Sequence, residues 1–305
     1  FFFKQTPAYA ILSGLVGSEM CIRDRNSALD CAKKMEYVLD PTIPYYTGVI
    51  RAMGTAVHKG HEAYYSNRRE TGEVHDTDPR RWVEAALDEF QTEIDRAGSR
   101  FDWRFDEAKP HLKTPKPEIL YDFEIAASKI AEAIVDYHQN KWYWPDGFEV
   151  IETELSFDLP WEGHDDWVRH GTIDLVLRDE KGLAHIVDHK TAKGPKKFAD
   201  FSAMKSPQAS YYFKAFELLD LGLGKPHPEF IYDVLALPPG KPVTFSRFWH
   251  PRSKQQISAV ESQANDLIRL IEQGGPFLPN TSSFLCSEMY CDYWDRCPYG
   301  STLKS

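Results

Sequence analysis

An aspartate and a lysine two residues apart, in a stretch that reads as a β-strand, are the residues of this sequence best placed for chemistry. The stretch IVDHKTAK holds Asp188 and Lys190, and the stretch GTIDLV holds Asp174. Side chains alternate between the faces of a strand, so Asp188 and Lys190 point the same way and His189 points to the opposite face. If the two stretches are neighbouring strands, two carboxylates and a lysine gather at one end of a small apolar sheet.

Charges at such a position are costly unless the carboxylates are paired or hold a metal. Carboxylate oxygens suit Mg²⁺ or Mn²⁺, which can polarise a phosphodiester and lower the pKa of an attacking water. Lys190 can position that water and offset the negative charge of the transition state. The alternative is an ion pair between Asp188 and Lys190 on the strand surface, and D-x-K alone does not decide between the two.

The first half of the chain is rich in helical patterns. Asn26 and Ser27 are good N-cap residues before apolar positions at roughly helical spacing, so a helix is predicted to begin there. A second helix is predicted over GVIRAMGTAVHKGHEAYYSNRR, after the turn at Pro41–Pro44. Two more are predicted at Pro79–Ala97 and Pro117–Lys141.

From Phe148 onward the pattern becomes rich in β-strands. Three strands are predicted over FEVIETELSFDLP, DWVRHGTIDLVLRD and LAHIVDHKTA, followed by a helix over SPQASYYFKAFELLDLG. Two further strands, FIYDVLALP and PVTFSRFWH, and a long polar helix at about Pro251–Gln273 complete the series. We expect one α/β unit, in which a helix crosses a meander of strands.

Composition limits the class of protein. At 305 residues and 42% hydrophobic residues, the chain can bury a large core. A net charge of −10 argues against a broadly basic, histone-like surface, although a local basic groove is enough for phosphate contacts. No stretch after the first 25 residues is long and apolar enough to span a bilayer. We therefore expect a soluble cytoplasmic protein with no membrane partner.

Residues 1–25 differ from the rest of the chain. Their apolar run is short for a membrane helix and lacks both a basic start and a clear small-residue cleavage site. The string GLVGSEMCIRDR is similar to a translated sequencing adapter. We therefore expect a non-native leader, with a disordered natural leader as the alternative, and leave Cys21 out of the functional interpretation.

Four short motifs follow one another in an order typical of a known family. They are GTAVH at Gly54–His58, GTID at Gly171–Asp174, DHK at Asp188–Lys190 and QASYY at Gln208–Tyr212. In this order the chain resembles the PD-(D/E)xK nuclease superfamily, and in particular its RecB/AddB-type branch, from Asn26 to Pro298. The resemblance implies an α/β fold with a restriction-endonuclease-like core, a central mixed β-sheet flanked by helices, and an N-terminal helical insertion.

The resemblance also implies a domain organisation. We expect residues 26–305 to form a single nuclease domain. Within it, the helical insertion is expected at about 52–145, the nuclease core at about 148–250 and a cysteine-rich tail at about 276–300.

By the same resemblance, the site holds Mg²⁺ or Mn²⁺. The ligands would be His58, Asp174, Asp188 and the backbone carbonyl of His189, and Lys190 would be the catalytic lysine. Imidazole and carboxylate donors are compatible with either ion. A lone helical histidine is more often structural, so the role of His58 depends on the motif order. The string HKGHE, which starts at His58, matches neither zinc-protease pattern.

Gln208 and Tyr212 lie one helical turn apart and share a helix face. The resemblance implies that this face looks into the site and contacts the DNA strand or the lysine; a capping glutamine with a core tyrosine is the alternative. Glu152 and Glu154 precede the motifs on a strand and are expected on the same strand face. We favour Glu154 as a secondary position at the site.

A cluster of lysines follows the D-x-K strand in KTAKGPKKF. We expect Lys193, Lys196 and Lys197 to contact DNA phosphates, with an exposed, solvated loop as the alternative. The aromatic side chains that could stack on bases are Trp161, Trp167, Phe198 and Phe201.

Three cysteines lie within CSEMYCDYWDRC, near the end of a chain with only five. Such clustering indicates metal binding in a reducing compartment. RecB-type nucleases with an iron–sulfur cluster use one cysteine near the N-terminus and three near the C-terminus, which implies a [4Fe–4S] cluster held by Cys31, Cys286, Cys291 and Cys297. The C-x4-C-x5-C spacing departs from the C-x2-C-x5-C form associated with AddB-type proteins. A structural Zn²⁺ site and buried thiols are the alternatives.

The resemblance implies a metal-dependent DNA exonuclease that acts in repair, recombination or phage DNA processing. Single-stranded DNA or duplex ends would be its substrates, and a helicase or recombination protein could be a partner. One alternative is a CRISPR-adaptation nuclease that trims spacer precursors. The other is a non-catalytic DNA-end-binding accessory protein, against which the complete set of His58, Asp174, Asp188 and Lys190 argues.

Overall fold

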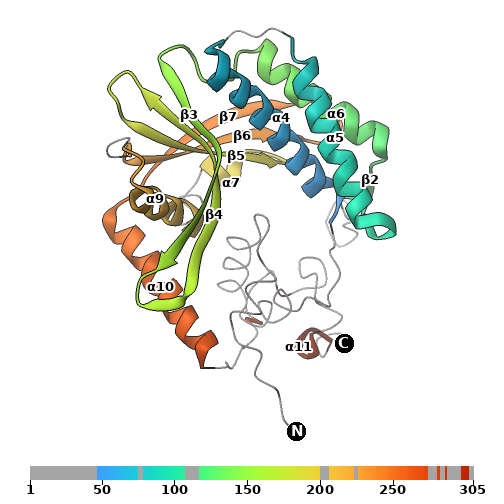
Figure 1. Ribbon diagram of the computed structural model, residues 1–305. Coiled ribbons are helices and arrows are strands. Elements are labelled where there is room, and N and C mark those ends of the chain that lie inside the picture. Colours follow the sequence, from blue (N-terminus) through green and yellow to red (C-terminus); the bar gives the residue numbers. More distant parts are fainter. Residues whose placement is uncertain are drawn as a thin grey trace.

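The computed structural model places helices on both faces of a five-stranded sheet (Figure 1). It describes residues 47–74, 78–106, 117–199, 206–222, 226–273, 280–281, 286 and 297–301. The leader at 1–25, the helix predicted at Asn26 and most of the cysteine-rich tail lie outside these residues. Among the described helices, none combines the length and the apolar character that a membrane crossing requires.

The sheet has the order β3-β4-β5-β6-β7, and three of its four strand pairings are antiparallel. Only β5 and β6 are parallel, so the chain between them must cross from one end of the sheet to the other, and this connection contains α7 and α9. The strands are β3 (Phe148–Trp161), β4 (His164–Asp179), β5 (Ala184–Ala192), β6 (Glu229–Ala236) and β7 (Thr244–Pro251).

Three long helices, α4, α5 and α6, cover one face of the sheet, and α9 and α10 cover the other (Figure 1). A small antiparallel pair of strands, β1 and β2, lies between α5 and α6 in the chain. The helices are α4 (Val49–Thr71), α5 (Arg80–Ala97), α6 (Phe123–Gln139), α7 (Lys196–Ala199), α9 (Pro207–Leu219), α10 (Lys254–Glu272) and α11 (Pro298–Ser301). The short strands are β1 (Arg104–Asp106) and β2 (Ile119–Leu120), and a 3-10 turn spans Gly98–Arg100.

Each face of the sheet packs against its own helical layer. On β5, Val187 lies in the apolar cluster with α4, α5 and α6, whereas Ile186 lies in the cluster with α9 and α10. The central strands β5 and β6 are therefore apolar along most of their length, as expected for strands that are covered on both sides. Any charged side chain on them must find its partner inside the protein.

The β3–β4 hairpin extends beyond the rest of the sheet and runs alongside α9 and α10 (Figure 1). Arg169 of β4 makes two hydrogen bonds to Glu261 of α10, at 2.7 and 2.6 Å. The indole N–H of Trp161 donates to Asn265 on the same helix at 2.6 Å. These contacts hold the end of the hairpin against the helical layer.

The architecture confirms the predicted α/β class and the mixed sheet flanked by helices. The helix predicted over Pro117–Lys141 is shorter than expected, because Ile119–Leu120 pair with β1 and the helix begins only at Phe123. Asp122 caps it, since its carboxylate accepts the N–H of Ile125 at 2.8 Å. The β1–β2 pair was not predicted, because strands of two and three residues leave little periodic signal.

Candidate active site

The strands β4 and β5 separate near the centre of the sheet. Their pairing ends at Leu175 with Val187, after which β4 continues beside β3 and β5 continues beside β6. Asp174 is the neighbour of Leu175 on β4, and Asp188 is the neighbour of Val187 on β5. Both aspartates are thus the first residues past the last pair. We call this opening between β4 and β5 the fork. It brings the two aspartates predicted for the site to one place.

The side chain of Asp174 accepts a backbone hydrogen bond at the fork, where β4 and β5 no longer pair. Its Oδ2 atom accepts the backbone N–H of His189 at 2.7 Å, and its side chain is only 8% exposed. A buried N–H without a partner would be destabilising, so the carboxylate satisfies a donor that strand pairing leaves open. Asp174 is thus fixed in orientation by the strand that carries the D-x-K motif.

Asp188 is fully buried and is held by two side chains. The Nζ atom of Lys190 lies 2.6 Å from its Oδ2 atom, and the amide of Gln208 donates to its Oδ1 atom at 3.2 Å. The same amide donates to the hydroxyl of Tyr212 at 3.1 Å. The structure therefore places Gln208 and Tyr212 on the face of α9 that looks into the fork. Asp188 is enclosed, and the side chain of Lys190, which is 26% exposed, covers it from the solvent side.

The electrostatics of this pair follow from its burial. Burial raises the pKa of Asp188 to about 7, although the positive charge of Lys190 opposes that shift. Burial alone would lower the pKa of Lys190, but the charges of Asp188 and Asp174 outweigh it and raise that pKa above its usual value. The fork therefore favours a cation beside Asp188, and Lys190 supplies one.

The helix α4 approaches β5 closely enough to bring His58 to the fork. A Cβ atom at Gly54 would lie 2.7 Å from the Oγ1 atom of Thr191, so only glycine permits this separation of helix and strand. One turn further on, Nδ1 of His58 lies 3.6 Å from Oδ2 of Asp174. The four-residue spacing of GTAVH thus places the close contact and the imidazole on the same helix face.

The side chain of His189 lies on the opposite side of β5 from Asp188 and packs against α4. Its ring stacks on His61, with 4.8 Å between centroids, and on Tyr65, with 5.8 Å between centroids. Sequence reasoning tested His61 only against zinc-protease patterns and missed this contact. Its position three residues after His58 was the signal that could have placed it on the same helix face.

Glu154 and Glu152 differ in their surroundings. Arg69 of α4 donates to both carboxylate oxygens of Glu152, at 2.6 and 2.5 Å. Glu154 lies between the pairs that join β3 to β4 on either side of Asp174, so it is next to that residue in the register. Its φ of 48° is unusual for a residue other than glycine and interrupts the regular alternation of the strand. The structure thus places Glu154 beside the fork.

The lysines after β5 are exposed. Lys193 and Lys196 are both open to solvent, and the Nζ atom of Lys193 lies 5.1 Å from the ring centroid of Phe105. The side chain of Lys197 lies outside the described part of the structure. Lys193 is three residues past Lys190 and lies just beyond the end of β5.

Two of the four aromatic residues considered for base stacking are wrong for that role. Trp161 is 7% exposed and has the Arg169 guanidinium 4.1 Å from its ring centroid. Phe198 is buried in the cluster beneath α9. Trp167 is partly buried, and Phe201 lies outside the described residues. Burial of Trp161 and Phe198 leaves no ring face for a base.

Two of the four predicted cluster cysteines are described. Cys297 is buried and begins the short segment that contains α11, and Cys286 is half-buried. Cys31 and Cys291 lie outside the described residues, as does most of the chain around them.

The donor types at the fork fit Mg²⁺ or Mn²⁺. Asp174 and Asp188 offer carboxylate oxygens and His58 offers an imidazole nitrogen. In the arrangement observed, Asp188 is engaged by Lys190 and Gln208. Within the described ranges, no three Asp, Glu, His or Cys side chains are grouped so that they could share one ion. The donor atoms are therefore of the types that bind Mg²⁺ or Mn²⁺. In this structure the Asp188 carboxylate contacts Lys190 and Gln208.

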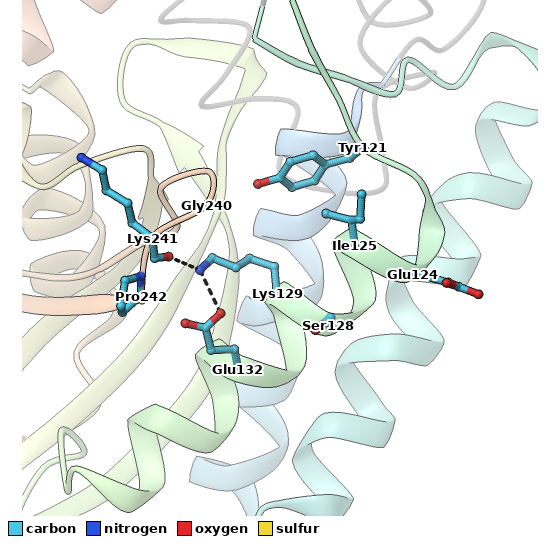
Figure 2. A pocket seen from close by; sticks show the side chains of 9 residues that line it. All are labelled: Tyr121, Glu124, Ile125, Ser128, Lys129, Glu132, Gly240, Lys241 and Pro242. Carbon is cyan, nitrogen blue, oxygen red and sulfur yellow. Dashed lines mark hydrogen bonds and ion pairs between the residues drawn. The ribbon is translucent and has the colours of Figure 1, made fainter.

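An open pocket lies away from the fork, between α6 and the loop that precedes β7 (Figure 2). Its volume is about 570 Å³. Figure 2 shows the amine of Lys129 pointing to the backbone oxygen of Lys241, at 2.5 Å, and to Glu132, at 2.8 Å. Glu132 also accepts the N–H of Val243 at 2.9 Å. Lys129 and Glu132 thus contact each other and the loop before β7, and the residues that line the pocket include none of the motif residues.

Comparison with known proteins assigns the chain to a family. A search of the curated proteins returned no match. A solved structure described as "Crystal structure of SSO0001" is similar, with a TM-score of 0.34 and 15% identity over 90% of this chain and 97% of that one. The family model for the PD-(D/E)XK nuclease superfamily matches residues 33–298, a span that includes all four motifs. The chain therefore belongs to the PD-(D/E)XK nuclease superfamily.

Proposed function

We propose that this chain is a metal-dependent exonuclease of the RecB/AddB type that removes nucleotides from DNA ends. Membership of the PD-(D/E)XK nuclease superfamily supports hydrolysis of phosphodiester bonds, and nucleases of this superfamily generally use Mg²⁺ or Mn²⁺. The observation that carries the proposal is the convergence at the fork of His58 from α4, Asp174 from β4, and Asp188 and Lys190 from β5.

The side chains at the fork have two proposed roles, which are metal binding and stabilisation of negative charge. A bound Mg²⁺ or Mn²⁺ would supply Lewis-acid polarisation of the phosphate and an activated water. Asp174, Asp188 and His58 would hold the ion, together with the backbone carbonyl of His189. Lys190, kept protonated by the two aspartates, offsets the negative charge that develops on the phosphate oxygens.

Groups around the fork orient these side chains and the substrate. Gln208 holds Asp188 from α9 and is itself held by Tyr212, so it fixes the carboxylate opposite Lys190. Lys193 and Lys196 are exposed and follow the fork in the chain, which suits contacts with the phosphates of a passing strand. We infer that single-stranded DNA or duplex ends enter here, delivered by a helicase or recombination partner.

The test is a nuclease assay on end-labelled single- and double-stranded DNA, blocked at the 5′ or the 3′ end, with Mn²⁺ or with EDTA. Wild-type protein is expected to release nucleotides with Mn²⁺ only, and Asp188→Asn and Lys190→Met are expected to abolish release. Glu149→Gln and Lys59→Met are matched controls, because their ion pairs, with Arg178 and Glu62, are partly exposed and include none of the motif residues. Both controls are expected to retain activity.

Two results would overturn the proposal. Equal activity of Asp188→Asn, Lys190→Met and wild-type protein would show that the fork is not the site of hydrolysis. Tight binding of DNA ends without hydrolysis in Mg²⁺ or Mn²⁺ would instead identify an end-binding accessory protein.

We also propose that Cys31, Cys286, Cys291 and Cys297 hold a [4Fe–4S] cluster. The buried position of Cys297 supports a site inside the protein. Iron and acid-labile sulfide are to be quantified in anaerobically purified protein, alongside its visible absorption. Four iron atoms per chain, lost in Cys297→Ser, are expected. Stoichiometric zinc without iron would replace the cluster by a Zn²⁺ site, and the absence of any metal would leave buried thiols.

A further inference from the structure

We propose that the stacked imidazoles of His61 and His189 are positioning residues, which hold α4 against β5 so that His58 and the His189 carbonyl face the metal. This inference rests on the proposed function, since it concerns the same site. Neither ring is a ligand in the set described above. Both rings lie behind the fork, on the side of β5 that faces α4.

The first step is the geometry of the stack. The rings of His61 and His189 lie 4.8 Å apart between centroids and only 19° from parallel, so they form an offset stack. His58 meets the same His189 ring edge-on, at 6.1 Å and 82°. One residue of β5 is therefore in contact with two successive turns of α4, and its backbone is that of the D-x-K motif.

The second step is how the stack is supported. The ring of Tyr65 lies 5.8 Å from that of His189, and its hydroxyl lies 2.7 Å from the hydroxyl of Tyr137 on α6. Tyr137 also packs edge-on against His61, at 4.2 Å. All four rings are buried. The stack is thus enclosed by fixed neighbours and cannot slide without moving α4 or α6.

The third step places His58 between two fixed contacts on α4. On one side, Gly54 comes so close to Thr191 that a methyl group could not be added. On the other, His61 rests on His189. A change at either contact tilts the helix and alters the 3.6 Å separation between His58 and Asp174. The stack therefore controls a distance between two groups of the proposed metal site.

The fourth step concerns the ring nitrogens of the two stacked histidines. Within the described structure, Nδ1 of His61 and Nε2 of His189 have no hydrogen-bond partner. A flat apolar ring can therefore take the place of His61, whereas an aliphatic chain cannot.

A second stack in the same sheet offers a matched control. The rings of His185 and His227 lie 4.6 Å apart and 23° from parallel, at the opposite end of β5. Their neighbours include Asp179, Trp249 and Glu229, none of which is a motif residue. A substitution of His227 therefore removes an imidazole stack from the same sheet at a position away from α4 and the fork.

The experiment measures Mn²⁺ binding directly, by titration followed with electron paramagnetic resonance, in full-length His61→Leu, His61→Phe and His227→Leu. The binding constant of His61→Leu is expected to weaken by about 10- to 100-fold, the usual effect of removing a group that orients metal ligands. His61→Phe and His227→Leu are expected to bind as wild type does. Circular dichroism checks that each variant is folded, and His61→Met replaces His61→Leu if the latter does not fold.

The outcomes separate this inference from the proposed function. Folded His61→Leu that binds Mn²⁺ as tightly as wild type would overturn the inference, as would equal losses in His61→Phe or in His227→Leu. Wild-type protein that binds Mn²⁺ but hydrolyses no DNA would overturn the proposed function alone. Wild-type protein that hydrolyses DNA while His61→Leu retains wild-type Mn²⁺ affinity would overturn the inference alone.

Discussion

The carboxylate of Asp174 accepts the backbone N–H of His189 at 2.7 Å, directly beyond the last paired residues of β4 and β5. The Asp174 side chain thus provides an acceptor for a backbone N–H of β5 at the point where β5 is no longer paired with β4. The same side chain lies at the proposed active site. Structural and chemical roles meet in this single contact. They can be separated by the choice of substitution.

Asp174→Ala is expected to lower the free energy of unfolding by about 1–3 kcal/mol, because the His189 N–H is left buried without an acceptor. Asp174→Asn keeps an acceptor oxygen and is expected to lose less stability. Both are expected to abolish Mn²⁺-dependent hydrolysis, since both remove the charge. Urea unfolding of the two variants measures the first effect. Equal losses of stability would show that the hydrogen bond is not what Asp174 contributes to the fold.

Gly54→Ala is expected to destabilise the protein by about 1–3 kcal/mol, because the new methyl group meets the Oγ1 atom of Thr191 at 2.7 Å. Thr191→Ala removes that oxygen, so the double variant is expected to recover most of the loss. Gly194→Ala is the control, since a Cβ atom there meets nothing within 4 Å. A double variant no more stable than Gly54→Ala alone would contradict the proposed close contact.

Gln208→Leu is expected to slow hydrolysis with little effect on DNA binding, because Asp188 loses the amide that holds its Oδ1 atom. Tyr212→Phe removes only the indirect support of Gln208 and is expected to have a smaller effect. Single-turnover rates at saturating Mn²⁺, together with DNA binding in EDTA, separate the two quantities. A larger effect of Tyr212→Phe than of Gln208→Leu would reverse the proposed order of contacts.

Acid sensitivity is expected to depend on His185. Burial lowers the pKa of this side chain, Asp179 opposes the shift and His227 adds to it, while Glu229 also faces the ring. A histidine whose pKa is lowered by folding stabilises the protein above its unfolded pKa of about 6.5, and this contribution is lost as the pH falls below that value.

In His185→Phe, the free energy of unfolding should therefore fall less between about pH 7 and pH 5 than it does in wild-type protein. Denaturant titrations across that window provide the measurement. An identical decline in the two proteins would mean that other groups cause the acid sensitivity.

Much of the fold was predictable because local sequence patterns determine its strands and helices. Alternation on β5 predicted that Asp188 and Lys190 would share a face and that His189 would point away, and the ion pair and the His61 stack confirm this. The apolar strands and helices after Phe148 were predicted close to their observed bounds. The order of four short motifs predicted the superfamily that the family model matches.

Local patterns were less informative about Glu154. Strand alternation placed it with Glu152 on one face, but its left-handed backbone interrupts that alternation. Such a backbone conformation is imposed by surrounding structure, because an isolated glutamate does not prefer it. Sequence periodicity therefore cannot anticipate it.

The sequence by itself determined the residue types of the candidate site, their order and the strand faces they occupy. Only the tertiary structure decided that β4 and β5 part at Asp174, that Gly54 meets Thr191 and that His61 stacks on His189. The physical reason is distance along the chain. More than 110 residues separate the end of α4 from the start of β5, and contacts at that range depend on the packing of whole elements. Alternation and helical spacing depend only on near neighbours.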